Sequence, residues 1–248
     1  MQIGKDVEKH TYCISNQDTK HQLESVNSIK DLGVVFDNKL EFNLHIEEKV
    51  NKANSMMGII RRGYKFLSVI NFVPLYKAMV RSYFDYASTV YYPLKKEHVN
   101  LIEGVQRRAT NLVPELKHLR YEDRLKKLKL PTLIYRRIRG DMIEMYKLTH
   151  GMYNYNPDLI VKFRDKSILR TGLRGHKYMI DKIFINSKIK KHFLSNRIAN
   201  LWNSMPEKFV NSFSINNFKN NLDKLWVNQE VVYDCTRSID SSLYSTYN

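Results

Sequence analysis

Basic side chains between residues 101 and 148 are the groups whose type and spacing indicate chemistry most clearly. Arginines occur there as adjacent pairs, and a guanidinium group can bind a phosphate through two parallel hydrogen bonds. Several such groups on helix faces favour contact with a nucleic-acid backbone, which positions a duplex without reading its bases. The residues predicted to contact phosphate are Arg107, Arg108, Lys126, Lys127 and Arg136.

The alternative for these arginines is pairing within the protein. Arg137 and Asp141 are four residues apart, the spacing at which two side chains meet on one helix face, so we assign Arg137 to structure. Arg139 is expected to pair in the same way with an acid on another helix. Asp85 lies among aromatic residues, where pairing with an arginine or accepting a hydrogen bond from a tyrosine is favoured over a role as a base.

No motif of a catalytic site is found in the sequence. It contains no glycine-rich phosphate loop, no HExxH, no nucleophile elbow and no adjacent Asp-Asp pair that could hold two metal ions. The histidines are scattered, and His45, His98 and His150 are expected to be solvated at helix ends or on polar faces. We therefore predict no catalytic residue, no metal site and no cofactor, and no enzymatic activity of the chain on its own.

The charge balance favours a polyanionic partner. Lys and Arg total 41 against 25 Asp and Glu, a formal net charge of +16. Nucleic acid suits such a protein, and the alternative is a solvated basic surface without a partner. Cys13 and Cys235 stand far apart, without the spacing of a disulfide framework or a zinc site.

The expected location is intracellular, in the nucleus or the cytoplasm. No apolar run reaches the roughly 18 residues that span a bilayer, and the first residues lack the apolar core of a signal peptide. A membrane partner is therefore not expected, and the scarcity of cysteines fits a reducing compartment.

Apolar periodicity predicts a mainly α-helical fold with a small β-structure at the start. Residues 1–42 contain two strand-like runs, at His10–Ser15 and Leu32–Phe36, too few to form a stable sheet alone. Residues 43–151 form a helical domain, with helices expected at 43–62, 74–92, 94–113, 121–129 and 133–149. Residues 152–227 form a basic, mainly helical region with short strand-like pieces, and residues 228–248 are expected to be a disordered polar tail.

Helix boundaries follow from local signals. Asn43 is the expected N-cap of the first helix, and Pro74 is placed in the first turn of the second. Arg124, Lys126, Lys127 and Lys129 are predicted to point outward from the short helix at 121–129. Thr132 and Ser214 are the expected N-caps of later helices, Gly151 is the expected stop after residue 149, and another helix is predicted at 189–203.

Several sequence blocks carry a resemblance to a known family. They are LGVVFD at 32–37, IEGVQRRATNLVP at 102–114, YEDRLKKLKLPTLIYRRIRGDMIEMYK at 121–147 and FLSNRIANLWNSMP at 193–206. In this order they resemble the region after the palm in reverse transcriptases of non-LTR retrotransposons of the LINE type, including jockey-like elements. The resemblance extends from Met1 to about Trp226.

The resemblance implies a helical, thumb-like bundle that holds an RNA/DNA template–primer duplex. It also implies that the first residues are a remnant of the palm, in which Leu32, Gly33 and Val34 match the primer-grip hairpin. The catalytic aspartates and their magnesium ions would belong to the palm, which this chain lacks, so an upstream palm or a full-length polyprotein is an expected partner. Ser82, Asp85 and Tyr91 depart from residues that are usual in the family.

Two other interpretations remain open. The chain could be a helical interaction module whose basic faces only keep it in solution. It could also be a non-functional retrotransposon relic that binds no nucleic acid. The salt dependence of binding to an RNA/DNA hybrid separates both from the predicted duplex-binding fragment.

Overall fold

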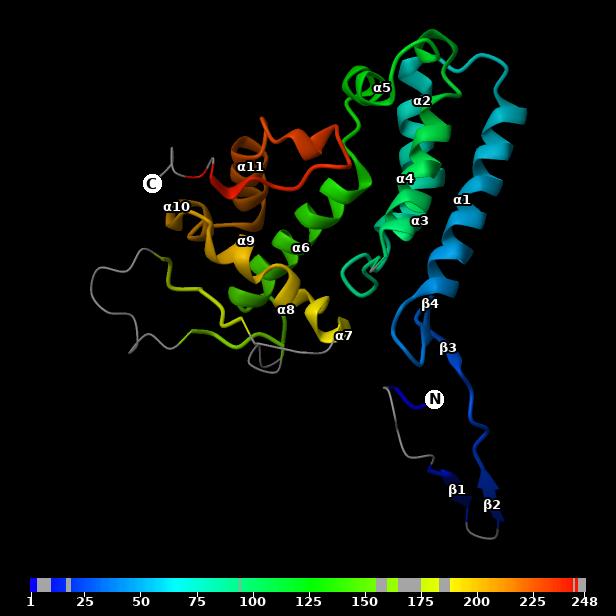
Figure 1. The fold of residues 1–248 in the computed structure, drawn as a ribbon, viewed down its shortest axis with the longest axis vertical. Helices are drawn as coiled ribbons and strands as arrows, with labels where there is room; N and C mark the ends of the chain where they lie inside the picture. The colour runs from blue at the N-terminus through cyan, green and yellow to red at the C-terminus, as the bar shows by residue number, and fades with distance from the viewer. Residues whose placement is uncertain are drawn as a thin grey trace.

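Helices form most of the chain, and two small antiparallel hairpins precede them, as predicted (Figure 1). The computed structural model describes residues 1–3, 10–16, 19–93, 95–154, 160–164, 175–182, 188–242 and 244. In Figure 1, the helices before residue 130 form one group, and helix α6 (Leu133–Thr149) leads from it to the helices that follow residue 187. Within the described residues, no helix is both long and apolar enough to cross a bilayer.

Each hairpin consists of two four-residue strands. In the first, β1 (Cys13–Asn16) pairs with β2 (Thr19–Gln22), and in the second, β3 (Ser28–Asp31) pairs with β4 (Val34–Asp37). Ile14 in β1 is 59% exposed, and Figure 1 shows the first hairpin extending away from the helices. An isolated two-stranded sheet is marginal in water, so this hairpin gains little stability from the rest of the described chain.

The predicted strand at Leu32–Phe36 begins two residues later than expected. Leu32 and Gly33 have φ angles of 43° and 77°, and they form the two-residue turn between β3 and β4. Two successive positive φ angles match the right-handed twist of a hairpin, and glycine adopts the second without a steric cost. Val34 is therefore the first residue of β4, and its side chain is buried.

Helix α1 (Asn43–Gly63) follows the predicted apolar stripe, but the expectation that Asn43 caps it is wrong. Phe42 occupies the N-cap position with a left-handed backbone, and its side chain makes no cap. Instead, the Asp37 carboxylate at the end of β4 accepts hydrogen bonds from the backbone N–H groups of Glu41 at 3.1 Å and Phe42 at 2.6 Å. Asp37 thus directs the chain from β4 into α1.

The second predicted helix begins and ends earlier than expected. It consists of α2 (Val69–Leu75), a π-helical segment (Tyr76–Arg81) and α3 (Ser82–Asp85). The Ser68 hydroxyl caps α2 by accepting a hydrogen bond from the Asn71 N–H, so Pro74 lies inside the helix rather than in its first turn. Proline removes one hydrogen bond of the helix ladder, and the π-helical segment directly after it is where the helix absorbs that disruption. Residues 86–92 are not helical.

Three further helices match their predicted positions closely. They are α4 (Lys96–Thr110), α5 (Tyr121–Leu128) and α6. The Thr132 hydroxyl caps α6 as predicted, accepting from the Tyr135 N–H at 3.2 Å. Gly151 follows the end of α6 with a φ of 63°, a conformation that glycine adopts readily at helix ends.

The predicted helix at 189–203 is divided into three short helices. These are α7 (Lys188–Lys191), α8 (Leu194–Arg197) and α9 (Ala199–Asn203). Phe193 has an extended backbone and interrupts the helical path. The strand-like segment at 177–180 forms only a single bridge, between Ile180 and Phe163. Residues 165–174 and 183–187 of the predicted basic region, and part of the predicted junction at 154–157, lie outside the described residues.

Two last helices complete this region, α10 (Glu207–Val210) and α11 (Ile215–Leu225). The Ser214 hydroxyl caps α11 as predicted, because it accepts a hydrogen bond from the Asn217 N–H at 3.1 Å.

The apolar side chains gather in two cores. The first contains residues from Val34 to Leu133, and the second contains residues from Tyr135 to Tyr244. Trp202 and Trp226, both fully buried, lie in the second core. Because most of α6 packs into the second core, the boundary between the cores falls at the start of α6. The sequence analysis had instead placed the domain boundary after residue 151.

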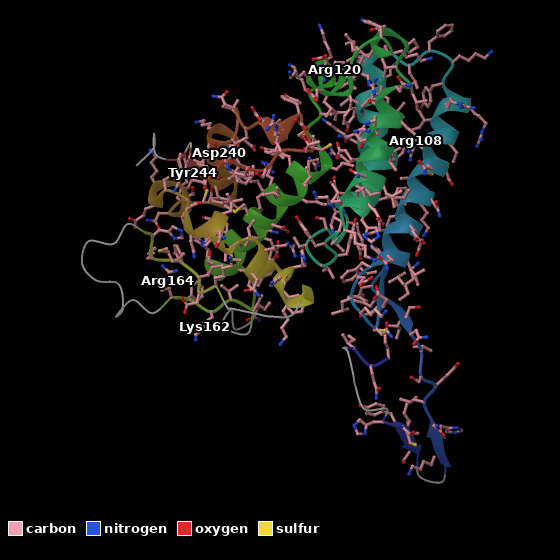
Figure 2. The ribbon with its side chains drawn as sticks, in the orientation of Figure 1. Arg108, Arg120, Lys162, Arg164, Asp240 and Tyr244 are labelled. Carbon is pink, nitrogen blue, oxygen red and sulfur yellow. The ribbon has the colours of Figure 1, made fainter. Side chains whose placement is uncertain are left out.

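The C-terminal segment, predicted to be a disordered tail, is folded over residues 228–242 and at Tyr244. Val231 is fully buried, and its carbonyl accepts a hydrogen bond of 2.6 Å from the Thr132 hydroxyl at the start of α6. Tyr244 is 2% exposed, and its hydroxyl accepts a hydrogen bond from the Trp226 indole at 2.8 Å (Figure 2). A few apolar anchors therefore hold a segment whose polar composition indicated disorder.

Replacing Tyr244 with phenylalanine is expected to lower the free energy of unfolding by about 1 to 2 kcal/mol, because the buried Trp226 N–H would lose its acceptor. Urea denaturation measures the change. Tyr12→Phe serves as the control, since Tyr12 is 58% exposed and its substitution should change stability by less than about 0.5 kcal/mol. Equal midpoints for Tyr244→Phe and the wild type would contradict the packing of this segment on α11.

Candidate nucleic-acid interface

The predicted pair Arg107 and Arg108 lies in the last turn of α4, with both side chains exposed. The Arg107 guanidinium lies 5.0 Å from the centre of the Tyr121 ring, a cation–π distance that leaves its hydrogen-bond donors free for a ligand. Arg108 donates a hydrogen bond to Asn54 on α1 at 3.0 Å. Figure 2 places Arg108 between α4 and α1.

Lys126 and Lys127 lie in the last turn of α5, and both side chains are exposed. Neither ammonium group has a charged partner among the residues that the structure describes. Lys126 borders a polar cleft that also contains Glu122 and Glu230, whereas Lys127 does not line it. Four of the five predicted phosphate contacts are therefore accessible cations on α4 and α5.

Arg124 does not point outward with them, contrary to the prediction. Its side chain is buried, and it donates hydrogen bonds to the Thr110 hydroxyl at 3.1 Å and to the Leu119 carbonyl at 3.0 Å. A third, longer bond reaches the Arg107 carbonyl. Arg124 thus satisfies carbonyl groups at the C-terminal end of α4, where a positive charge is also favoured by the helix dipole.

A buried carboxylate positions α4, α5 and α6 relative to one another. Glu103 on α4 accepts hydrogen bonds from the Tyr121 hydroxyl at 2.5 Å and from the Leu133 N–H at the start of α6 at 2.9 Å. Gln106 donates to the Pro131 carbonyl at 3.0 Å and accepts from the Tyr76 hydroxyl at 2.6 Å. Burial raises the pKa of Glu103, while these hydrogen bonds and the nearby Arg107 charge oppose that rise.

Arg136 differs from the other predicted phosphate contacts, because its guanidinium already has a partner. It binds Asp85 through two hydrogen bonds of 3.2 and 2.9 Å, and Arg81 binds the same carboxylate at 3.1 Å. The expectation that Asp85 pairs with an arginine is confirmed. We therefore leave Arg136 out of the proposed interface, because binding phosphate would require it to give up Asp85.

Arg137 is structural, as predicted, but its partner is not Asp141. It is 5% exposed and donates to the Tyr91 carbonyl at 3.1 Å and to the Tyr91 hydroxyl at 2.8 Å. Asp141 instead binds Arg197 on α8 through two bonds of 2.8 and 2.6 Å. The helical spacing identified two residues on one helix, but tertiary packing brings a different arginine to the carboxylate.

Arg197 connects three separate parts of the chain. Besides Asp141, it donates hydrogen bonds to the Thr89 carbonyl at 2.9 Å and to the His192 carbonyl at 2.7 Å. Arg139 pairs across helices as predicted, with Asp223 on α11, through bonds of 2.6 and 2.7 Å. These ion pairs hold α6 against its neighbours.

The hairpin turn with Leu32, Gly33 and Val34 lies against α1 and the segment after α3. The Leu32 carbonyl accepts a hydrogen bond from the Tyr86 hydroxyl at 2.6 Å, and the Gly33 carbonyl accepts one from the Lys49 ammonium at 3.3 Å. The Leu32 side chain is 83% exposed. These bonds hold the turn in place and leave Leu32 accessible to a ligand.

The expectation that His45 and His98 are solvated is wrong, since they are 0% and 6% exposed. The His45 Nδ1 accepts a hydrogen bond from the Val35 N–H at 3.2 Å, and its ring packs against Tyr91 at 4.5 Å. Burial, followed by the Lys49 charge, lowers the pKa of His45 to about 4. His150 is partly buried and stacks on Tyr146 at 3.9 Å.

His45 leads us to predict that stability falls as the pH decreases from about 6.5 to about 4. In that window the unfolded chain binds a proton at His45 and the folded protein does not, so acid favours unfolding by an amount on the order of 3 kcal/mol. Urea midpoints measured across this range test it. His45→Gln keeps an acceptor for Val35 and should give a flatter pH profile, whereas parallel profiles would refute the assignment.

The sequence analysis missed a second group of accessible cations, at the end of α1. No Asp or Glu occurs between residues 49 and 84, although seven Lys and Arg do. Arg61, Arg62 and Lys65 from this stretch are exposed, and no acid in the described part of the chain pairs with them. The absence of acids over so long a stretch was the signal that could have identified them.

Comparisons with known proteins show one distant similarity. The chain is 26% identical over 136 residues to the uncharacterized protein B0403.1 of Caenorhabditis elegans, an alignment that covers 54% of this chain and 68% of the relative. The chain matches no protein-family model and no solved structure at a significant level.

Proposed function

We propose that this chain is the thumb-like part of a non-LTR retrotransposon reverse transcriptase and that it binds the phosphate backbone of an RNA/DNA template–primer duplex. The observation that carries the proposal is the group of four exposed cations, Arg107, Arg108, Lys126 and Lys127, at the ends of α4 and α5. The fold does not consume these charges in ion pairs, whereas it uses Arg136 in this way. Cations left accessible in this way suit phosphate contacts.

The arrangement of the helices supports a duplex lying along α1 and α4. The hairpin turn at Leu32 lies near the start of α1, and α5 lies toward its other end (Figure 1). A helix of 21 residues is about 30 Å long. At about 3.4 Å per base pair, that length corresponds to roughly nine base pairs. In this proposal the turn and the basic group contact opposite ends of one duplex segment.

The same proposal assigns catalysis to another part of the polyprotein. The sequence has no adjacent aspartate pair, so the magnesium ions of polymerisation would be held by the palm that this chain lacks. The exposed first hairpin supports a partner of this kind, because a two-stranded sheet of its size is normally completed by further strands. An upstream palm or the full-length polyprotein, in the nucleus or the cytoplasm, is the partner that we propose.

Binding to a labelled RNA/DNA hybrid of about 20 base pairs, measured by fluorescence anisotropy between about 50 and 200 mM NaCl, tests this function. With four phosphate contacts, log K should fall with log[NaCl] with a slope near −3.6. No detectable binding at about 50 mM NaCl, or binding that does not respond to salt, would overturn the proposal. Magnesium-dependent primer extension by the purified chain would overturn its assignment as a non-catalytic part.

A further inference from the structure

The loop between α1 and α2 exposes aromatic and basic side chains together. Phe66 is 88% exposed, Tyr64 is 45% exposed, and Ile70 at the start of α2 is 82% exposed. Arg61, Arg62 and Lys65 lie in the same short stretch and are also exposed. We call the residues from Arg61 to Ile70 the α1–α2 tip.

The fold holds the tip in this conformation. The Tyr64 N–H continues the α1 ladder by donating to the Ile60 carbonyl at 3.0 Å, and the Ser68 hydroxyl caps α2. Between them, Leu67 is 6% exposed and packs into the first core. Anchors on both sides of Phe66 therefore keep its ring outside the core. Because burying a phenylalanine would stabilise the fold, this exposure points to a ligand rather than to stability.

The charges around the ring restrict the chemistry of that ligand. The tip lies within the stretch of residues 49–84 that contains no acid, so an anionic partner meets no repulsion from neighbouring residues in sequence. A flat apolar ring beside several cations suits a molecule that combines planar apolar faces with regularly spaced negative charges. Unpaired nucleotides have this combination, since every base has a face that stacks on an aromatic ring.

We propose that the α1–α2 tip binds a single-stranded segment of nucleic acid, with an unpaired base stacked on Phe66 and the adjacent phosphates bound by Arg61, Arg62 and Lys65. A duplex does not fit this role, because its base faces are covered by neighbouring base pairs. The tip and α5 lie at the same end of the first helical group (Figure 1). The inference rests on the proposed function, to which it adds a site for the unpaired strand that extends beyond the duplex.

The test compares Phe66→Ala with Phe213→Ala in the full chain. Phe213 is also 88% exposed but lies between α10 and α11, so the control removes an equally exposed ring from a different surface. Labelled oligo(dT) of about 20 nucleotides and an RNA/DNA duplex of the same length serve as probes. We expect Phe66→Ala to weaken oligo(dT) binding by about 5- to 150-fold and to leave duplex binding unchanged. Phe213→Ala should change neither.

Two more variants distinguish stacking from general apolar contact. Phe66→Trp should retain oligo(dT) binding, and its indole fluorescence should be quenched on binding, whereas Phe66→Leu should lose affinity as Phe66→Ala does. Wild-type affinity in Phe66→Leu or Phe66→Ala would overturn the proposal. It would equally be overturned if Phe66→Ala abolished binding to phosphatidylserine vesicles while oligo(dT) binding stayed intact, since the tip would then be a membrane contact.

The two proposals fail in different ways. If the wild type binds the duplex with the expected salt dependence but oligo(dT) binding does not depend on Phe66, only the single-strand site is refuted. If the wild type binds neither probe at about 50 mM NaCl, nucleic-acid binding itself is refuted, and the single-strand site with it.

Discussion

Replacing Asp141 with alanine is expected to lower the free energy of unfolding by about 3 to 5 kcal/mol, because it leaves the Arg197 guanidinium buried without its carboxylate. The two side chains are only 3% and 8% exposed, so water cannot take the place of the lost partner. Urea denaturation followed by tryptophan fluorescence measures the change directly, since both tryptophans lie in the core that this ion pair borders.

Asp223→Ala is the matched control for this experiment. It breaks the ion pair with Arg139, which joins α6 to α11 through the same two-bond geometry, but the Asp223 side chain is 49% exposed. Exposed ion pairs contribute little, so the expected loss is about 0.2 to 1 kcal/mol. Similar losses for Asp141→Ala and Asp223→Ala would show that burial does not explain the importance of the Asp141 pair.

Alanine substitution of Arg107, Arg108, Lys126 and Lys127 together is expected to weaken binding of an RNA/DNA duplex by roughly three orders of magnitude at about 0.1 M NaCl. Each lost phosphate contact removes the release of about one counterion, so the salt slope should become less negative by about 3.6. Anisotropy titrations at several salt concentrations measure both quantities. The fold should tolerate the change, because all four side chains are exposed and only Arg107 contributes a ring contact, of about 0.5 to 1 kcal/mol.

The position of the charges, and not only their number, is tested by a second pair of lysines. Lys190 and Lys191 on α7 are adjacent and exposed, like Lys126 and Lys127 on α5. Alanine at 126 and 127 should reduce the salt slope by about 1.8, and alanine at 190 and 191 should leave it nearly unchanged. Equal effects of the two double substitutions would indicate that only the net charge of +16 attracts the duplex.

The sequence blocks that resemble reverse transcriptases contain residues that hold the fold together. Within IEGVQRRAT, Glu103 and Gln106 are buried and join α4 to the start of α6. In the later blocks, Asp141 and Arg197 bind each other. Arg107 and Arg108 are the members of the first block that remain exposed. The recurrence of such blocks is thus explained by buried polar contacts, and a role in binding concerns a smaller set of side chains.

The sequence by itself determined the elements whose signals are local. The apolar spacing identified α1, α4, α5 and α6, because helix formation depends on neighbours three and four residues away. Thr132 and Ser214 could be assigned as caps for the same reason, since a cap bonds a backbone group within its own turn. The exposure of Arg107, Arg108, Lys126 and Lys127 also followed from their positions beside the apolar stripes.

Only the tertiary structure decided which polar groups meet across long distances in the chain. Asp141 binds Arg197, 56 residues away, rather than Arg137, and Asp37 rather than Asn43 directs the entry into α1. Arg124 and His45 look solvated in the sequence, yet both are buried. Helical period fixes the angular position of a side chain but not what packs over it, and burial of a polar group depends on whether a distant partner satisfies it.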